Sequence, residues 1–240
     1  MTALRPLDSY DGFVFDLDGV LTPTAIVHEH AWGALFRAYF TEHHVTPEYT
    51  DADYYAHLDG RPRYDAVASL LESRGIQLPW GSPEDAPEMD TVCGLGNRKN
   101  VVFADTLKRD GVTPYPGSVA LLDWLGAHGV RVAVASSSRN ARPVLAAAGL
   151  DNRFSTVVDG VVSAREHLAG KPAPDIFVRA AQLEGMDPAR SVVVEDAISG
   201  VAAGHNGGFT VVGVDRGAGA EALSAAGADV VVSDLAELLS

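Results

Sequence analysis

Five short apolar runs constrain the fold of this chain more than any other feature of its sequence. They lie at residues 12–15, 130–135, 191–194, 209–214 and 228–232. The last four are rich in valine and continuous rather than alternating, which is typical of strands covered on both faces. Helical stretches at 141–148 and 197–203 separate them. Alternating strands and helices predict an α/β fold, a doubly wound parallel sheet of at least five strands with a Rossmann-like core.

The stretch between residues 25 and 108 has a different character. Its clearest amphipathic runs, 31–40 and 64–74, have helical spacing, and it contains no valine-rich strand. The segment 75–89 carries three prolines and is predicted to be a loop. We therefore predict that residues 25–108 form an inserted α-helical cap domain and that residues 1–24 and 109–240 form the α/β catalytic core.

Composition excludes several classes of protein. The 240 residues carry a net charge of −14, which argues against a nucleic-acid-binding protein and against binding to anionic membranes. The single cysteine, Cys93, cannot form an internal disulfide and suits a reducing compartment. No signal peptide and no apolar run long enough to span a membrane is visible. We expect a cytoplasmic monomer that neutralises an anionic substrate with local cations.

Polar residues follow three of the predicted strands. Asp16-Leu17-Asp18-Gly19 comes directly after the first, Ser136 to Ser138 after the second, and Glu195-Asp196 after the third. Lys171 lies in a loop before a helix that starts near Pro174. In an open parallel sheet the carboxyl ends of the strands form the ligand-binding edge. We therefore expect these side chains to meet.

Each of these features alone has a structural explanation. The Asp-Gly pair could be an ordinary turn. The serines could cap a helix, and the Glu-Asp pair could complement a helix dipole. Lys171 could be a solvated loop residue. Their coincidence at one edge of the sheet favours a phosphoryl-transfer site.

The chemistry of phosphoryl transfer gives each residue a role. Two acids on the same side of a strand end suit a nucleophile, Asp16, and an acid/base, Asp18. Mg²⁺ prefers oxygen ligands, which Asp16 and Asp196 can provide with the backbone carbonyl of Asp18 and with Glu195 nearby. The phosphoryl oxygens need cations and hydrogen-bond donors, which Lys171 and Ser136 can supply.

The order of these motifs resembles that of the haloacid dehalogenase superfamily over nearly the whole chain. The acidic pair at 16 and 18, the strand-terminal Ser136, Lys171-Pro172 and Glu195-Asp196 match its four motifs. Within the superfamily the chain resembles the β-phosphoglucomutase-like subfamily. That likeness rests on His28, on Gly60-Arg61-Pro62-Arg63 and on Arg98-Lys99-Asn100.

The resemblance implies substrate-binding roles for six residues. Arg63, Ser138 and Asn140 would hold a second phosphate, for which a planar guanidinium is suited. Lys99 and His28 would orient the sugar hydroxyls and Asp18, and Thr24 lies in the hinge to the cap. Read without the resemblance, the arginine and lysine could equally be surface charges, and the histidine could be a helix-surface residue.

The leading hypothesis is a Mg²⁺-dependent mutase that acts on a small phosphorylated sugar. It would interconvert β-glucose 1-phosphate and glucose 6-phosphate through an aspartyl phosphate and a bisphosphate. A phosphatase of the same superfamily, acting on a sugar phosphate or another small phosphoester, is the alternative. A phospho-acceptor similar to response-regulator receivers is a third possibility, which an inserted cap disfavours because a docking switch needs an open site.

Overall fold

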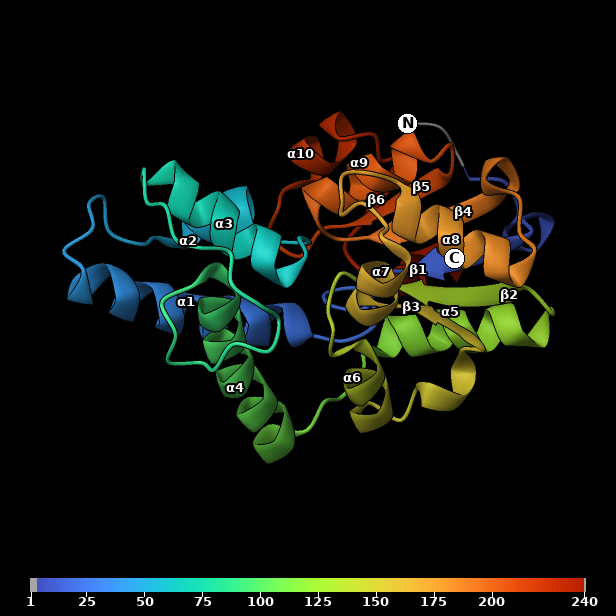
Figure 1. Ribbon diagram of the computed structural model, residues 1–240. Coiled ribbons are helices and arrows are strands. Elements are labelled where there is room, and N and C mark those ends of the chain that lie inside the picture. The colour runs from blue at the N-terminus through green and yellow to red at the C-terminus, as the bar shows by residue number, and fades with distance from the viewer. Residues whose placement is uncertain (1–3, 240) are drawn as a thin grey trace. The chain divides into compact units, whose positions relative to one another are not determined.

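The larger part of the molecule is built on a six-stranded sheet in which all neighbours are parallel, with the order β3-β2-β1-β4-β5-β6 (Figure 1). The computed structural model describes residues 4–239. The strands are β1 (Gly12–Phe15), β2 (Arg131–Ala135), β3 (Thr156–Val158), β4 (Ser191–Glu195), β5 (Thr210–Val214) and β6 (Val230–Val232). Every residue of β1 and β4 is buried, as expected for central strands covered on both faces.

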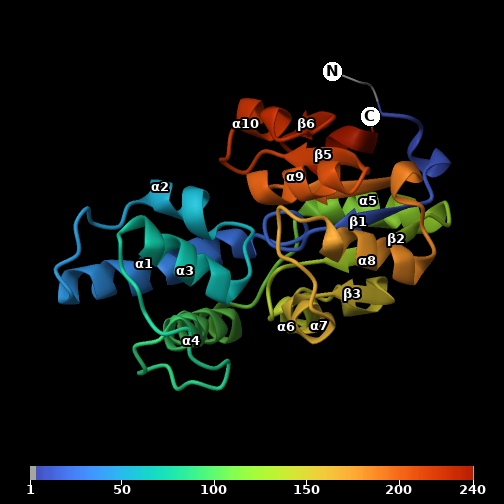
Figure 2. The same ribbon diagram turned by 45° about the horizontal axis from the view of Figure 1, so that its top comes forward.

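In the described part of the sheet-containing unit, six α-helices connect or flank these strands. They are α5 (Pro116–Ala127), α6 (Ala141–Ala147), α7 (Gly160–Glu166), α8 (Asp175–Glu184), α9 (Ile198–Asn206) and α10 (Ala220–Ala225). Apolar residues of α8, α9 and α10 pack with inward-facing residues of the sheet into one buried cluster. Helix α5 lies on the side of β1 and β2 opposite to α8 (Figures 1 and 2). The doubly wound fold predicted from the sequence is confirmed.

The valine-rich runs were located to within two residues, but β3 was missed. It is only three residues long and pairs with Ala133–Ala135 of β2. Its apolar run is only Val157-Val158, flanked by Thr156 and Asp159, whereas β6, which is equally short, consists of three valines. Its position at the edge of the sheet is a property of the tertiary structure.

The chain divides into two compact units. One contains the sheet and is formed by the chain up to Thr24 and from Val112 onward, and the other is the helical segment Ala25–Gly111. The helical unit contains α1 (Thr24–Glu42, whose first residue belongs to the sheet unit), α2 (Asp51–Asp53), α3 (Arg63–Ser73) and α4 (Val92–Asp110). The boundary expected after residue 108 is wrong by three residues, because α4 continues to Asp110 and ends at Gly111, which has a φ of 68°.

The helical unit has its own core, in which aromatic residues of α1 are prominent. Trp32, Phe36, Tyr39 and Phe40 of α1 pack with apolar residues of α3 and α4. This explains why the segment has helical rather than strand periodicity: each helix buries one apolar stripe against the others.

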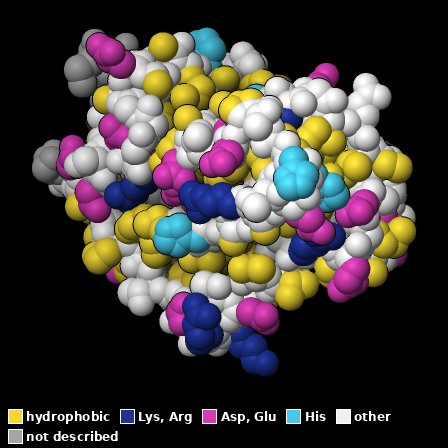
Figure 3. All heavy atoms as spheres, turned by 90° about the vertical axis from the view of Figure 1, so that its left-hand side faces the viewer, with side chains coloured by type: hydrophobic (Ala, Val, Ile, Leu, Met, Phe, Trp, Pro, Cys, Tyr) yellow, Lys and Arg dark blue, Asp and Glu magenta, His cyan; other side chains and the backbone are white. Residues whose placement is uncertain are grey.

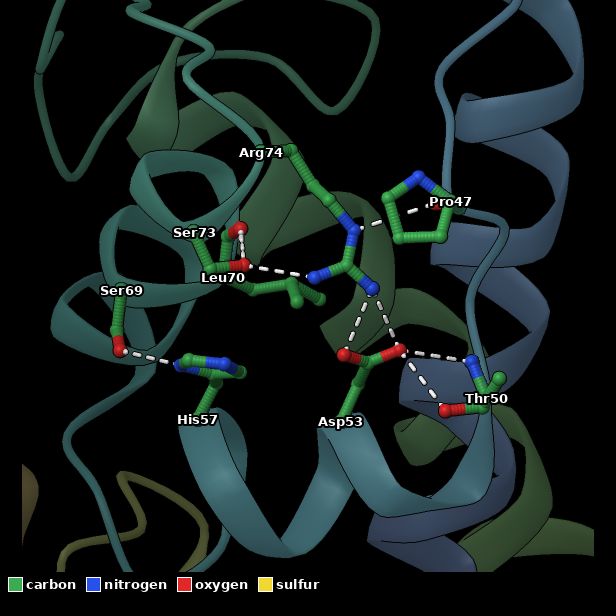
Figure 4. A network of polar contacts seen from close by, with 8 residues as sticks. All are labelled: Pro47, Thr50, Asp53, His57, Ser69, Leu70, Ser73 and Arg74. Carbon is green, nitrogen blue, oxygen red and sulfur yellow. Dashed lines mark hydrogen bonds and ion pairs between the residues drawn. The ribbon is translucent and has the colours of Figure 1, made fainter.

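A buried ion pair connects the end of α2 to the end of α3 in the helical unit. Arg74 donates from Nη2 to both carboxylate oxygens of Asp53, at 2.7 and 2.8 Å, and from Nε to the carbonyl of Pro47 (Figure 4). Asp53 also accepts a hydrogen bond from the backbone N–H of Thr50 at 2.8 Å, which completes a capping box at the start of α2. His57 contacts Ser69 in the same network.

The surface agrees with the acidic composition. On the face drawn in Figure 3, the Lys and Arg side chains are scattered among Asp, Glu and hydrophobic side chains and form no continuous basic patch. Among the described helices, none is long and apolar enough to cross a membrane.

Candidate active site

The sheet has its topological switch point between β1 and β4, because β2 and β3 lie on one side of β1 and β4, β5 and β6 on the other. Predicted site residues lie at the carboxyl ends of β1 and β4. Asp16 follows β1 directly, and its backbone N–H continues the ladder to the carbonyl of Val194 at 2.9 Å. Glu195 is the last residue of β4. In doubly wound sheets the crevice at this reversal is where ligands bind.

Lys171 joins the two strand ends. Its Nζ atom lies 2.5 Å from Oδ1 of Asp16 and 2.6 Å from Oε1 of Glu195. The lysine side chain is 1% exposed and its ammonium group lies 4.9 Å from the centroid of the Phe177 ring. The structural alternative for this residue, a solvated loop lysine, is therefore wrong.

The protonation of these groups reflects their crowding. Burial raises the pKa of Asp16 to about 8; Lys171 opposes this rise, and the nearby charges of Glu195 and Asp18 add to it. Burial lowers the pKa of Lys171, but the charges of Asp16 and Glu195 outweigh it, so that this pKa is raised. The carboxylates of Asp16, Asp18 and Glu195 thus repel one another in spite of Lys171, and a bound cation would favour their charged forms.

Two glycines leave room for the carboxylates of Glu195 and Asp196. A Cβ atom at position 19 would lie 1.8 Å from Oδ2 of Asp196, and one at position 200 would lie 1.6 Å from Oε1 of Glu195. The carboxylates of Asp196 and Glu195 therefore occupy the space that a side chain at position 19 or 200 would fill. Gly19 also has a φ of 86°, a conformation that few other residues adopt.

Asp18 is held by hydroxyl groups on both of its oxygens. Thr24, the first residue of α1, donates from Oγ1 to Oδ1 at 2.5 Å, and Ser136 donates from Oγ to Oδ2 at 3.4 Å. Thr22 and Thr24 share a further hydroxyl contact of 2.7 Å. The structure thus brings Asp18, Thr24 and Ser136 together, as a chain of groups able to hold or pass a proton.

The other predicted residues after β2 form tight local turns. Ser136 accepts a hydrogen bond from the N–H of Ser138, and Ser138 accepts one from the N–H of Asn140, both at 3.1 Å. The N-cap of α6 is Asn140 and not a serine. The serines therefore stabilise the loop that precedes the helix rather than its first turn.

The donor set suits Mg²⁺ in part. Asp16 and Asp196 are buried oxygen donors beside the turn at Gly19, and Mg²⁺ is usually bound by one or two carboxylates that leave positions for water and phosphate oxygens. Glu195, in contrast, accepts from Lys171 and, at 2.8 Å, from the N–H of Ala197. Within residues 4–239, no three His, Cys, Asp or Glu side chains converge on one point. The structure therefore offers two buried carboxylates for Mg²⁺, and the metal roles of Asp18 and Glu195 stay predictions.

Two of the predicted cap residues lie together in the helical unit. Lys99 of α4 is 3% exposed, contacts Nδ1 of His28 on α1, and has its ammonium group 4.7 Å from the centroid of the Trp32 ring and 5.0 Å from that of Phe103. The His28 ring lies against the Phe103 ring at a tilt of 33°, with 4.0 Å between the centroids. Lys99 is therefore a buried, oriented cation and not an ordinary surface charge.

Arg63 forms a second group in the same unit. It donates from Nη2 to Oδ1 of Asn100 at 2.7 Å and from Nη1 to Oδ1 of Asn97 at 3.2 Å. Tyr64 also donates to Asn97, at 3.0 Å. Asn97 was not predicted; its position three residues before Asn100, one turn away on the same helix, is the signal that would have found it.

Arg216 was also missed, although the rule applied to the other strands would have revealed it. Asp215 and Arg216 are the residues just past β5. The side chain of Arg216 donates from Nε to the carbonyl of Gly19 at 3.0 Å. A residue just after the fifth strand of the chain thus reaches the turn that carries the acidic pair.

Comparison with known proteins defines the class of this chain. Residues 10–208 match the haloacid dehalogenase-like hydrolase family. The chain belongs to this family, and it is an enzyme that acts by phosphoryl transfer. The receiver-like alternative is therefore wrong.

Three relatives place the chain within the family. It is 51% identical over 236 residues to a protein of Mycobacterium tuberculosis named beta-phosphoglucomutase, with 94% of this chain and 90% of the relative covered. It is 29% identical over 207 residues to the fructose-1-phosphate phosphatase YqaB of Escherichia coli, with 86% and 97% covered. The crystal structure of beta-phosphoglucomutase from Clostridium difficile superimposes with a TM-score of 0.78 at 25% identity, covering 95% of this chain and 93% of that one.

Proposed function

We propose that this protein is a Mg²⁺-dependent phosphosugar mutase that converts β-glucose 1-phosphate to glucose 6-phosphate. The observation that carries the proposal is the arrangement at the strand ends. A buried acid, Asp16, is paired with a buried lysine, and a second acid, Asp18, is held by two hydroxyl groups. The 51% identity to a protein named beta-phosphoglucomutase supports the choice of substrate.

In this proposal Asp16 is the nucleophile. One of its carboxylate oxygens attacks phosphorus, a bond to phosphorus forms, and the bond from phosphorus to the sugar oxygen breaks. Lys171 neutralises charge on Asp16 and on the phosphoryl oxygens, since its ammonium group already lies 2.5 Å from Asp16. Mg²⁺, held by Asp16 and Asp196, would withdraw charge from the transferring group.

Asp18 moves the proton. It gives one to the sugar oxygen that leaves and takes one from the sugar hydroxyl that receives the phosphoryl group. Thr24 and Ser136 orient it, because each donates to a different carboxylate oxygen. The phosphoryl group of the aspartyl phosphate passes to O6 of β-glucose 1-phosphate. The bisphosphate then returns its 1-phosphate to Asp16, and glucose 6-phosphate leaves.

Arg63 would bind the phosphate that is not reacting. Its guanidinium is oriented by Asn97 and Asn100, so less conformational freedom is lost on binding. His28 and Lys99 would contact the sugar, and Ser138 and Asn140 would contact the second phosphate from the sheet unit. Substituting Arg63→Lys should raise KM more than it lowers kcat. Arg37→Lys, which alters an exposed pair with Asp51 in the same unit, is the control.

The direct test is the fate of the phosphoryl group. Purified protein is incubated with β-glucose 1-phosphate, Mg²⁺ and a trace of glucose 1,6-bisphosphate, and glucose 6-phosphate and inorganic phosphate are both measured. A mutase yields glucose 6-phosphate in large excess. Inorganic phosphate without glucose 6-phosphate would refute the mutase and establish the second candidate, a phosphatase, which the likeness to YqaB favours.

A second experiment tests the role of Asp18. The Asp18→Asn variant keeps the size of the side chain and removes its proton-transfer chemistry. It should fold, bind Mg²⁺ and lose turnover by about 10²- to 10⁴-fold. Full activity in this variant would contradict the acid/base role.

A further inference from the structure

Arg216 connects three loops at the carboxyl edge of the sheet. Its Nε atom donates to the carbonyl of Gly19 at 3.0 Å, and its Nη1 atom donates to the carbonyl of Ser233, after β6, at 2.9 Å. The guanidinium carbon lies 3.9 Å from the centroid of the Tyr115 ring. The side chain is therefore fixed by two carbonyls and one aromatic face.

The neighbouring carbonyls of the acidic turn are held as well. Ser118, which is 1% exposed, donates from Oγ to the carbonyl of Val20 at 2.6 Å, and the backbone N–H of Tyr115 donates to the carbonyl of Leu21 at 3.0 Å. With Gly19, three consecutive carbonyls after Asp18 are held by groups from beyond the inserted helical unit. Arg216 donates to the carbonyl of Gly19, which is the carbonyl nearest to the acidic pair in the chain.

Stability alone does not explain the arginine. Its Nη2 atom is buried and has no hydrogen-bond partner within residues 4–239, and leaving a buried donor unpaired costs free energy. Gly19 is also the residue whose α-carbon lies against Asp196. A shift of its carbonyl would therefore move the backbone between Asp18 and Asp196.

We infer that Arg216 is a positioning residue for Asp18 and Asp16, acting through the carbonyl of Gly19. The inference rests on the proposed phosphoryl-transfer roles of these two acids. A misplacement of about 1 Å at reacting groups can lower turnover by about 10²-fold. The planar guanidinium donates to two carbonyls at once in fixed directions, whereas a lysine offers a point charge on a flexible stem.

The chain offers a matched control at the opposite edge of the sheet. Arg131, at the start of β2, donates to the carbonyls of Asp11, Glu184 and Gly185 at 2.8–3.0 Å. It has the same chemistry as Arg216, a guanidinium bound to loop carbonyls, but lies at the end of the sheet away from the acids. Arg216→Met and Arg131→Met therefore remove similar bonds at different places.

The experiment measures thermal unfolding, kcat and KM for wild type, Arg216→Met, Arg216→Lys and Arg131→Met, with β-glucose 1-phosphate and Mg²⁺. Turnover is counted as glucose 6-phosphate plus inorganic phosphate. Both methionine variants should lower the unfolding midpoint. Only Arg216→Met should lower kcat, by about 10- to 10²-fold, with KM changed less than about threefold. Arg216→Lys should have an intermediate kcat.

Two results would overturn the inference. The first is that Arg216→Met and Arg131→Met both have a kcat close to that of wild type. The second is that Arg216→Lys has a lowered unfolding midpoint but the kcat of wild type. This second result decides the question if Arg216→Met does not fold. If wild type releases only inorganic phosphate, the mutase proposal fails, but the contrast between the arginine variants is still measured on total turnover.

Discussion

The carboxylate of Asp196 lies so close to the α-carbon of Gly19 that a Cβ atom there would be 1.8 Å from Oδ2. The turn after β1 and the end of β4 therefore fit together only because position 19 lacks a side chain. The second glycine of this kind, Gly200, stands in the same relation to Glu195. Both acids proposed to act at the end of β4 thus depend on a glycine elsewhere in the chain.

Gly19→Ala should abolish most of the activity. The new Cβ displaces Asp196, and the φ of 86° adds about 1–2 kcal/mol of backbone strain. Gly208→Ala is the control, because Gly208 has a φ of 78° and nothing within 4 Å of its Cβ position. It should show the strain alone, with a lower unfolding midpoint and normal kcat. Equal activities of the two variants would contradict the role assigned to Gly19.

Gly200→Ala in α9 should lower stability by about 1–3 kcal/mol through overpacking against Glu195. It should also lower kcat, because Glu195 would leave Lys171. The same substitution at Gly126, in α5, meets open space and should raise stability by about 0.5–1 kcal/mol, since alanine favours the helix. Chemical denaturation of both variants measures the difference, and the prediction requires opposite signs.

Lys171→Met should lower stability by about 3–5 kcal/mol, because it leaves the buried carboxylates of Asp16 and Glu195 without a cation. It should also lower kcat by about 10²- to 10³-fold. Adding Glu195→Gln removes one of the two charges and should recover stability but not activity. Lys108→Met, at an exposed position of α4, should change neither. A double variant no more stable than Lys171→Met would show that charge repulsion is not the cause.

The ion pair between Asp53 and Arg74 should make stability depend on pH. Burial raises the pKa of Asp53, but hydrogen bonds from Arg74 and Thr50 outweigh it, so that the pKa lies below its usual value. A carboxyl group whose pKa is lower in the folded state stabilises the fold at pH values above its unfolded pKa of about 3.9. This stabilisation is lost as the pH falls through the folded-state pKa. Asp53→Asn should therefore cost about 2 kcal/mol at pH 7 and progressively less below about pH 4.

Asp51→Asn is the control for this measurement. Asp51 lies two residues before Asp53 and pairs with Arg37, but both of these side chains are more than half exposed. An exposed pair contributes about 0–1 kcal/mol, so the variant should follow wild type at every pH. Thermal unfolding between pH 2.5 and 7 compares the three proteins. A constant difference between wild type and Asp53→Asn across this range would contradict the assignment.

Much of the sheet was predictable because its strands carry their own signal. A central parallel strand is buried on both faces, so 191–194 and 209–214 are valine-rich in the sequence itself. β3 was missed because its apolar run is only Val157-Val158, between Thr156 and Asp159, whereas the equally short edge strand β6 consists of three valines. The end of the inserted unit was placed three residues early, because α4 continues past residue 108 to Asp110.

From the residues alone one recognises the class of fold, the insertion of a helical unit, and the acids and lysine at the strand ends. These follow from local chemistry, because periodicity and strand-end residues can be recognised along the chain. Folding adds contacts that no local pattern shows: Lys171 pairs with both Asp16 and Glu195, Gly19 makes room for Asp196, and Arg216 holds the acidic turn. Each of these contacts joins residues 24 to about 200 positions apart, and burial between strand ends is what brings them within bonding distance.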